Sequence, residues 1–139
     1  MLCLYVAEEY FINSLDETKN LAIRLSDYLE PGTPIFLFGP VGIGKSTLVK
    51  LLLEHFNITY RGSPTFGLMS VYETNLPYSI VHMDLYNKPN KVVQEIYELQ
   101  DNVFLIEWPS IQLEKILPNP IRIELAMSGK NRIARLFLP

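Results

Sequence analysis

Cysteine is almost absent from this sequence. Cys3 is the single thiol, so the chain forms no internal disulfide and has no paired cysteines for a metal site. A lone thiol is typical of proteins in a reducing compartment, and we therefore expect a cytoplasmic location. Basic residues are also too few for a self-sufficient nucleic-acid binder: 12 lysines and arginines face 15 acidic residues, for a formal net charge of −3. Contact with RNA is expected to be indirect, through a partner protein.

Long apolar runs are missing as well. No stretch approaches the roughly 18 apolar residues that a transmembrane helix requires. The apolar start, residues 1–11, contains Glu8 and Glu9 and has no basic residue before it, unlike a secretory signal. We expect no membrane partner. The hydrophobic share of 48% in 139 residues instead predicts a single domain, residues 1–139, with a packed core.

Hydrophobic periodicity and turn residues predict alternating strands and helices. Ser14 and Glu17 have the spacing of a capping box, which begins a helix after a strand at 9–13. The apolar run at 34–38 is typical of a strand buried on both faces of a parallel sheet. Helices are also predicted after residue 44 and at 91–99, and strands at 58–60, 66–73, 78–85, 103–108, 121–126 and 133–138. The strands 66–73 and 78–85 are close enough in sequence to pair across a turn.

A phosphate-binding motif follows the strand at 34–38. The segment Gly39-Pro40-Val41-Gly42-Ile43-Gly44-Lys45-Ser46 matches GxxxxGK[ST] at every fixed position. Its glycines let the backbone wrap an anion, and the helix that begins at Gly44 adds its positive end. Lys45 would reach the β- and γ-phosphates of a nucleoside triphosphate, and the Ser46 hydroxyl is a hard ligand for Mg²⁺. The alternative is a glycine-rich turn before a helix, which has no need of the lysine and the hydroxyl.

The motif and its neighbours together predict the fold class. A strand precedes the loop and a helix follows it, as a P-loop requires. We therefore expect an α/β fold: a three-layer sandwich of the P-loop NTPase type, with a mixed, mostly parallel sheet that includes an antiparallel strand pair.

Two acidic residues end predicted strands. Asp84 closes Ile-Val-His-Met-Asp, and Glu107 closes Val-Phe-Leu-Ile-Glu. A P-loop NTPase needs a carboxylate at such a position to hold Mg²⁺ or its water. Either acid also suits an attacking water that must be oriented or deprotonated. The sequence leaves the division of these roles open, and a solvated strand end is the less favoured alternative for each acid.

Three further features each have a structural and a functional interpretation. His82 shares a strand face with Asp84, and a buried, hydrogen-bonded histidine is the favoured interpretation there. For Trp108, core packing is as favoured as the two functional interpretations together, a contact with the nucleotide or with a partner surface. The segment Ser63-Pro64-Thr65-Phe66 is a turn by composition. It also stands where many P-loop proteins keep a loop that senses the γ-phosphate, and Thr65 offers it a hydroxyl.

In combination these segments resemble the TsaE family of bacterial ATPases, which act in the synthesis of threonylcarbamoyladenosine in tRNA. The resemblance extends over essentially the whole chain. It rests on four segments in order: GPVGIGKST (39–47), SPTFGLMSVY (63–72), HMDLY (82–86) and IEWP (106–109). The sequence departs from the family pattern at Asn87, where an arginine usually follows Asp-Leu-Tyr.

The resemblance implies specific roles. ATP would be bound by the eight residues Gly39 to Ser46 with Thr47 beside them, and Leu15 and Arg132 would contact its base or ribose. Magnesium would be held by Ser46 and Glu107, and Asp84 would position or deprotonate water at the γ-phosphate. Lys45 and Thr65 would complete the catalytic set. The implied partners are TsaD- and TsaB-type proteins of the complex that transfers threonylcarbamoyl to adenosine 37 of tRNA.

The leading hypothesis is therefore a magnesium-dependent ATPase that services this complex and is slow when alone. No arginine is placed by the sequence as a finger on the phosphates, so we expect the partner complex to stimulate hydrolysis. A small-molecule kinase is one alternative, although the strands after the P-loop helix leave no lid helices; a phosphorylated acceptor would identify it. A binding module that uses ATP without turnover is another. Normal function after loss of Asp84 and Glu107 would favour that module.

Overall fold

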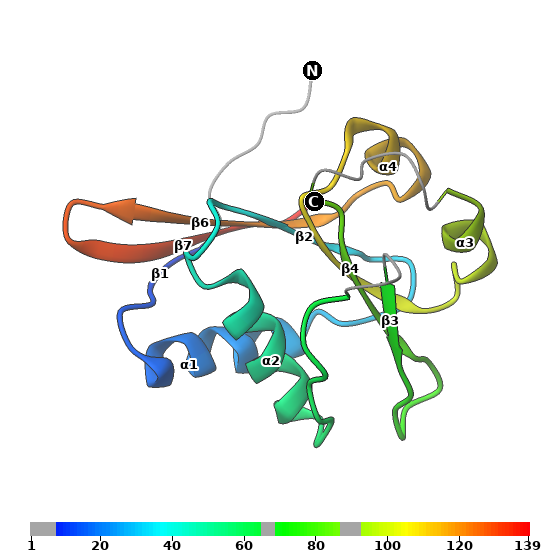
Figure 1. The fold of residues 1–139 in the computed structure, drawn as a ribbon, viewed down its shortest axis with the longest axis horizontal. Coiled ribbons are helices and arrows are strands. Elements are labelled where there is room, and N and C mark those ends of the chain that lie inside the picture. Colours follow the sequence, from blue (N-terminus) through cyan, green and yellow to red (C-terminus); the bar gives the residue numbers. More distant parts are fainter. Residues whose placement is uncertain (1–7, 65–68, 87–92) are drawn as a thin grey trace.

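The computed structural model describes residues 8–64, 69–86 and 93–139. These residues form seven strands in one sheet and four helices (Figure 1). The elements are, in chain order, β1 (Glu8–Phe11), α1 (Leu15–Ser26), β2 (Ile35–Phe38), α2 (Lys45–His55), β3 (Met69–Tyr72), β4 (Ile80–Asp84), α3 (Val93–Glu98), β5 (Val103–Glu107), α4 (Ile111–Ile116), β6 (Ile121–Ser128) and β7 (Asn131–Phe137). None of these helices has the length and apolar character needed to cross a membrane.

The strand order is β1-β7-β6-β2-β5-β4-β3. The central strands run parallel, in the pairs β2–β5, β2–β6 and β4–β5. The outer pairs β1–β7, β6–β7 and β3–β4 are antiparallel. The mixed α/β sheet predicted from the sequence is confirmed, with one correction. Antiparallel pairs equal parallel ones in number, because the β6–β7 hairpin and β1 extend one side of the sheet.

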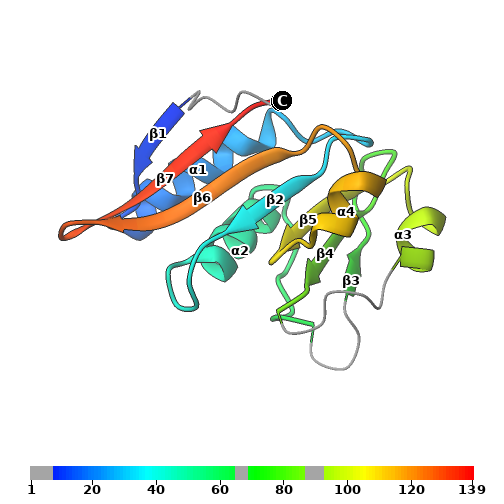
Figure 2. The same ribbon diagram turned by 90° about the horizontal axis from the view of Figure 1, so that it is seen from above.

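The helices cover both faces of the sheet, as expected for three layers (Figures 1 and 2). Successive residues of β2 point to opposite faces: Ile35 packs in the core under α1 and α2, and Phe36 in the core under α3 and α4. The first core includes Leu21 of α1 and Leu52 of α2, both almost fully buried. A strand buried on both faces explains why residues 34–38 are almost wholly apolar.

The start of α1 is tied to the far end of the chain. Ser14 caps the helix, since its Oγ accepts a hydrogen bond from Glu17 N at 3.1 Å. The Glu17 carboxylate accepts from Asn13 N at 3.0 Å rather than from the Ser14 amide of an ideal capping box. Asn13 Oδ1 in turn accepts from Arg132 N at 2.8 Å. The first turn of α1 and the beginning of β7 are thereby held together.

One local prediction was wrong, and one helix was missed. Residues 58–60 form no strand, because Ile58 N donates back to Leu53 O at 3.0 Å and so closes the turn that ends α2. The helix α4 was not predicted. Its cap is Ser110, whose Oγ accepts from Leu113 N at 3.3 Å, and a single turn and a half of helix leaves too short an apolar pattern to recognise.

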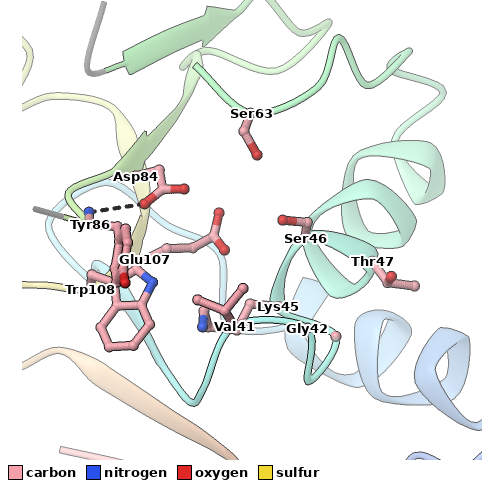
Figure 3. A pocket seen from close by; sticks show the side chains of 11 residues that line it. Val41, Gly42, Lys45, Ser46, Thr47, Ser63, Asp84, Tyr86, Glu107 and Trp108 are labelled. Atoms are coloured by element: carbon pink, nitrogen blue, oxygen red, sulfur yellow. Dashed lines mark hydrogen bonds between the residues drawn. The ribbon is translucent and has the colours of Figure 1, made fainter. Parts of the chain in front are cut away.

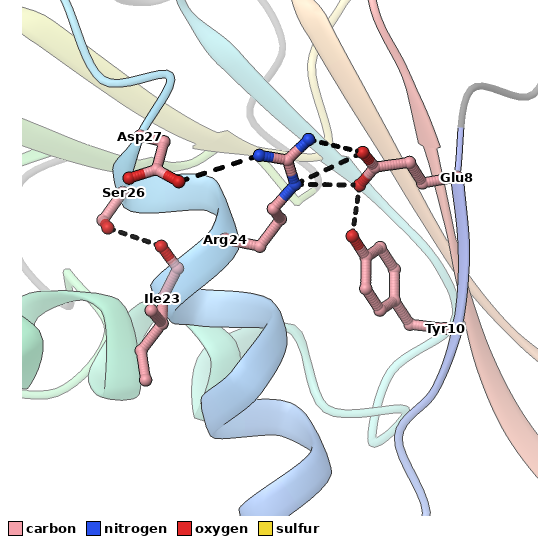
Figure 4. A network of polar contacts seen from close by, with 6 residues as sticks. All are labelled: Glu8, Tyr10, Ile23, Arg24, Ser26 and Asp27. Carbon is pink, nitrogen blue, oxygen red and sulfur yellow. Dashed lines mark hydrogen bonds and ion pairs between the residues drawn. The ribbon is translucent and has the colours of Figure 1, made fainter.

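A polar network fastens the edge strand β1 to α1 (Figure 4). The Arg24 guanidinium donates to the Glu8 carboxylate, with Nη2 2.7 Å from Oε1, and Tyr10 also donates to this carboxylate. The pKa of Glu8 is lowered below its ordinary value, mainly by the hydrogen bond from Arg24 and to a smaller extent by the hydrogen bond from Tyr10. Arg24 also lies 3.7 Å from Asp27. Arg24 is thus occupied far from the carboxyl ends of the parallel strands.

Candidate functional site

The motif residues meet where the parallel strands end. The chain leaves β2 into the loop 39–44, while Asp84 ends β4 and Glu107 ends β5. Asp84 and Glu107 face each other in the register of these two strands, so both carboxylates emerge at one edge of the sheet. A cavity of about 390 Å³ opens there. Its lining residues are Val41, Gly42, Gly44, Lys45, Ser46, Thr47, Ser63, Asp84, Tyr86, Glu107 and Trp108 (Figure 3).

The loop backbone has a conformation that its glycines permit. Gly42 and Gly44 have φ of 83° and 123°, a region that other residues rarely adopt. Gly44 is the residue before α2, so the first turn of that helix opens onto the cavity. The N–H groups of a first helical turn have no partner within the helix and carry the positive end of its dipole. The geometry of the loop therefore suits an anion.

Lys45 is folded back onto the loop. Its ammonium donates to Gly39 O and, at 3.2 Å, to Pro40 O, and it lies 4.3 Å from the centre of the Trp108 ring. Burial lowers the pKa of Lys45, while the negative charges of Glu107 and Asp84 act in the opposite direction. The lysine is held by neutral carbonyl groups and an aromatic ring, which a phosphate group would outcompete as a partner.

The two carboxylates have different surroundings. Glu107 is 2% exposed, and its Oε2 lies 2.7 Å from Nε2 of the equally buried His82. Asp84 is half-buried and accepts from the Tyr86 amide at 3.1 Å. Figure 3 shows the side chains of Glu107 and Ser46 pointing toward each other across the cavity, with Asp84 and Ser63 beside them. Hydroxyl and carboxylate oxygens of this kind suit a hard divalent cation.

A second, smaller cavity of about 180 Å³ adjoins the first. It is lined by Leu15 and Arg132, by the residues before α1 and by Ile43 of the loop. Gly44 and Thr47 line both cavities, so the two are connected across the start of α2. Leu15 is exposed for 69% of its surface, so its side chain is accessible to a ligand in this cavity.

Most of the residues selected from the sequence meet in these two cavities. Gly39 and Pro40 line neither cavity; their carbonyl oxygens accept hydrogen bonds from the Lys45 ammonium. Thr65 lies outside the described residues, as does Phe66. The sequence reasoning missed Tyr86, which lines the cavity and packs its ring 5.0 Å from that of Trp108. Its one signal was an aromatic residue close behind Asp84.

Comparison with known proteins identifies the family of this chain. The family model described as "Threonylcarbamoyl adenosine biosynthesis protein TsaE" matches residues 12–136. The chain belongs to the TsaE family. Among relatives with the name "tRNA threonylcarbamoyladenosine biosynthesis protein TsaE", that of Rickettsia felis is 35% identical over 87% of this chain and 74% of its own. That of Rickettsia bellii is 36% identical over 79% of each chain.

The fold of this TsaE-family chain also matches a solved structure. The crystal structure of Bacillus subtilis YdiB superposes with a TM-score of 0.77, covering 99% of this chain and 88% of that one. The sequence identity is 24%, so the likeness is one of fold.

Gly39 has the most restricted place in the loop. A Cβ there would lie 2.7 Å from Leu125 O and 3.0 Å from Ile43 Cγ2, and φ is +147°. We expect Gly39→Ala to lower the free energy of unfolding by about 2–4 kcal/mol, the sum of a backbone strain and an overpacking term. Urea denaturation followed by circular dichroism measures this.

Gly32→Ala is the matched control. Gly32 also has a positive φ, of +87°, but a Cβ there meets nothing within 4 Å, so backbone strain alone is expected, about 1–2 kcal/mol. If the two variants lose the same free energy of unfolding, the close approach of residue 39 to β6 adds no cost beyond backbone strain.

Proposed function

We propose that this TsaE-family chain binds ATP with magnesium and hydrolyses it slowly, in the cytoplasm, in support of threonylcarbamoyladenosine synthesis at adenosine 37 of tRNA. The observation that carries the proposal is the convergence of Lys45, Ser46, Asp84 and Glu107 on one cavity at the start of α2. A phosphate-binding backbone, one cation and two carboxylates are the parts that phosphoryl transfer to water requires.

The loop residues bind and orient the triphosphate. The backbone of residues 39–46 wraps the phosphates, and the first turn of α2 directs N–H groups at them. Lys45 leaves the carbonyls of Gly39 and Pro40 for the phosphate oxygens, which are charged and form stronger hydrogen bonds. The positive charge is thereby placed where negative charge develops during hydrolysis.

The donor set fits magnesium. Ser46 and Glu107 point at each other across the cavity and would hold the ion, which supplies neutralisation and orientation of the phosphate oxygens when bound (Figure 3). In the described part of the chain, no three His, Cys, Asp or Glu side chains cluster around a metal position. Phosphate oxygens and water would complete the coordination, and metal affinity would depend on the nucleotide.

Asp84 is assigned to the attacking water. Its half-buried carboxylate stands beside Glu107 in the β4–β5 register, close to Ser63 at the cavity mouth. One of its oxygens accepts from the Tyr86 amide, which fixes the carboxylate and leaves the other oxygen for a water molecule. Thr65, beyond the described residues, remains the proposed sensor of the γ-phosphate.

The adjoining cavity accommodates the rest of the nucleotide. With phosphates at Gly44 and Thr47, ribose and base extend over Leu15 and toward Arg132. Leu15 offers an apolar surface for the base, and the Asn13–Arg132 hydrogen bond keeps the two sides of this cavity together.

Stimulation of ATP hydrolysis is assigned to a partner protein. Each of the five arginines lies in the described residues, and none lines the phosphate cavity. Arg24, Arg122 and Arg135 are engaged with Glu8, Glu114 and Glu9, and Arg61 with the backbone of β3. An arginine finger raises such rates by about 10³–10⁵. We propose that TsaD- and TsaB-type proteins of the threonylcarbamoyl-transfer complex complete the site, with tRNA bound by them.

The proposal is tested on the protein and in the cell. Trp108 is the single tryptophan and touches Lys45, so ATP with Mg²⁺ should change its fluorescence, and phosphate release should be slow and rise with the partner complex. Depletion of the protein should lower threonylcarbamoyladenosine in bulk tRNA, measured by mass spectrometry. Unchanged modification, or ADP formed together with a phosphorylated acceptor, would refute the proposal.

A further inference from the structure

His82 is a buried polar side chain that the proposed steps do not use. It is fully buried in β4, at 0% exposure, on the α2 side of the sheet. Its Nε2 lies 2.7 Å from Glu107 Oε2. The ring centroids of His82 and Tyr60 are 6.0 Å apart. Three members of the site, His82, Asp84 and Glu107, therefore project from one face of two adjacent strands.

The strand register explains this meeting. β4 and β5 are parallel, with His82 opposite Leu105 and Asp84 opposite Glu107. Side chains two residues apart share a face, so His82 lies one pleat below Asp84 and diagonal to Glu107. Glu107 thus has Asp84 at its own level, at the cavity, and His82 beneath it, in the core.

The hydrogen bond has one direction. A carboxylate that acts as a metal ligand only accepts, so in the proposed site Nε2 carries the proton and donates to Glu107 Oε2. His82 Nδ1 is buried without a hydrogen-bond partner in the described part of the chain. The contact with Glu107 is therefore the polar interaction that the structure shows for this ring.

Core packing alone does not account for a histidine here. Burying an imidazole with one unpaired nitrogen is unfavourable, and an apolar residue of similar size would fill β4 without that penalty. What the imidazole adds is a donor for a carboxylate that is itself 2% exposed. A buried carboxylate without such a donor has an unsatisfied oxygen and lacks a partner that fixes its orientation.

We infer that His82 is a positioning residue for Glu107: it holds Oε2 from the core side so that the carboxylate keeps one orientation and presents Oε1 to the cavity. The inference rests on the proposed function, in which Glu107 holds magnesium. Outer partners that hydrogen-bond a metal ligand fix its orientation, and their loss typically lowers metal affinity or activity by about 10–100-fold.

Two amides at position 82 provide the test. In His82→Gln the side-chain nitrogen stands as far along the chain as Nε2 and still reaches Glu107, whereas in His82→Asn it stands at the level of Nδ1 and falls short. We titrate Mg²⁺ into each protein with a non-hydrolysable ATP analogue, follow Trp108 fluorescence, and measure analogue affinity in EDTA by calorimetry. His82→Asn should raise the half-saturating Mg²⁺ concentration by about tenfold or more. His82→Gln should stay within about threefold of the wild type, and analogue affinity in EDTA should be unchanged in both.

Each other outcome has a definite meaning. If Asn and Gln give the same Mg²⁺ dependence, or if both lose analogue binding in EDTA, His82 serves core packing and the inference is overturned. A third measurement adds His82→Asn to Glu107→Gln: a further shift in Mg²⁺ dependence would show that His82 does not act through Glu107. A wild-type protein that binds no analogue contradicts the proposed function itself, which separates the two failures.

Discussion

Replacing Lys45 with methionine is expected to lower ATP affinity by about 10–100-fold and phosphate release at saturating ATP by about 10²–10³-fold. Methionine is close to lysine in length, so the flexible apolar chain is retained, but the ammonium that lies over the Trp108 ring is lost with its charge. The affinity loss corresponds to hydrogen bonds from a charged donor, and the rate loss to a positive charge that matches the transition state better than the ground state. Calorimetry with ATP and a phosphate-release assay measure the two effects.

Lys50→Met is the matched control. Lys50 lies on the same helix, with its side chain 54% exposed and 3.9 Å from Glu54, and it does not line the phosphate cavity. Its loss should leave ATP affinity and rate within about twofold, because an exposed pair contributes little. Equal effects of the two substitutions would mean that net charge, and not the position of Lys45, governs binding.

The phosphate loop was predictable because its signal is local. All of its determinants, from Gly39 to Ser46, are consecutive, and the buried strand before it is marked by an apolar run. Strand ends were predictable for the same reason, since Asp84 and Glu107 each follow a run of buried residues. The family resemblance and the family match agree on the same stretch of chain.

Relations between distant residues were not available from local patterns. The placement of Asp84 opposite Glu107 depends on strand register, and register is set by packing across the sheet. Leu15 and Arg132 were chosen through the resemblance. They are brought together by the hydrogen bond from Arg132 N, in β7, to Asn13 Oδ1, in the connection between β1 and α1. The edge pairing of β1 with β7 likewise follows from tertiary contacts, and it changed the expected balance of the sheet.

Short segments were assigned wrongly or missed for a different reason. The six residues of α4 contain a cap, Ser110, but too few apolar positions to show a helical period. Residues 58–60 have high strand propensity, yet the turn that closes α2 engages Ile58 first. His82 shows the limit of pattern reasoning at the site: its burial was expected, but its partner lies on the next strand.

Asp84 and Glu107 should give different kinetic defects when each is replaced by its amide. Glu107→Gln is expected to raise the Mg²⁺ concentration for half-maximal ATP binding by about tenfold or more, because a buried anionic ligand is removed. Asp84→Asn is expected to lower phosphate release by about 10²–10⁴-fold while ATP affinity at saturating Mg²⁺ changes by less than about threefold. A Mg²⁺ titration of binding and a single-turnover assay separate the two.

The reason for this assignment is the environment of each carboxylate. Glu107 is buried, faces Ser46 and is held from below by His82, which suits a fixed ligand. Asp84 is half-buried at the cavity, where one of its oxygens accepts from the Tyr86 amide and the other is open to water.

Glu54→Gln is the control, because Glu54 is a half-exposed acid near the end of α2, and the substitution should change neither quantity. If Asp84→Asn carries the Mg²⁺ shift and Glu107→Gln the loss of rate, the two roles are exchanged, and His82 would then position the base rather than the metal ligand.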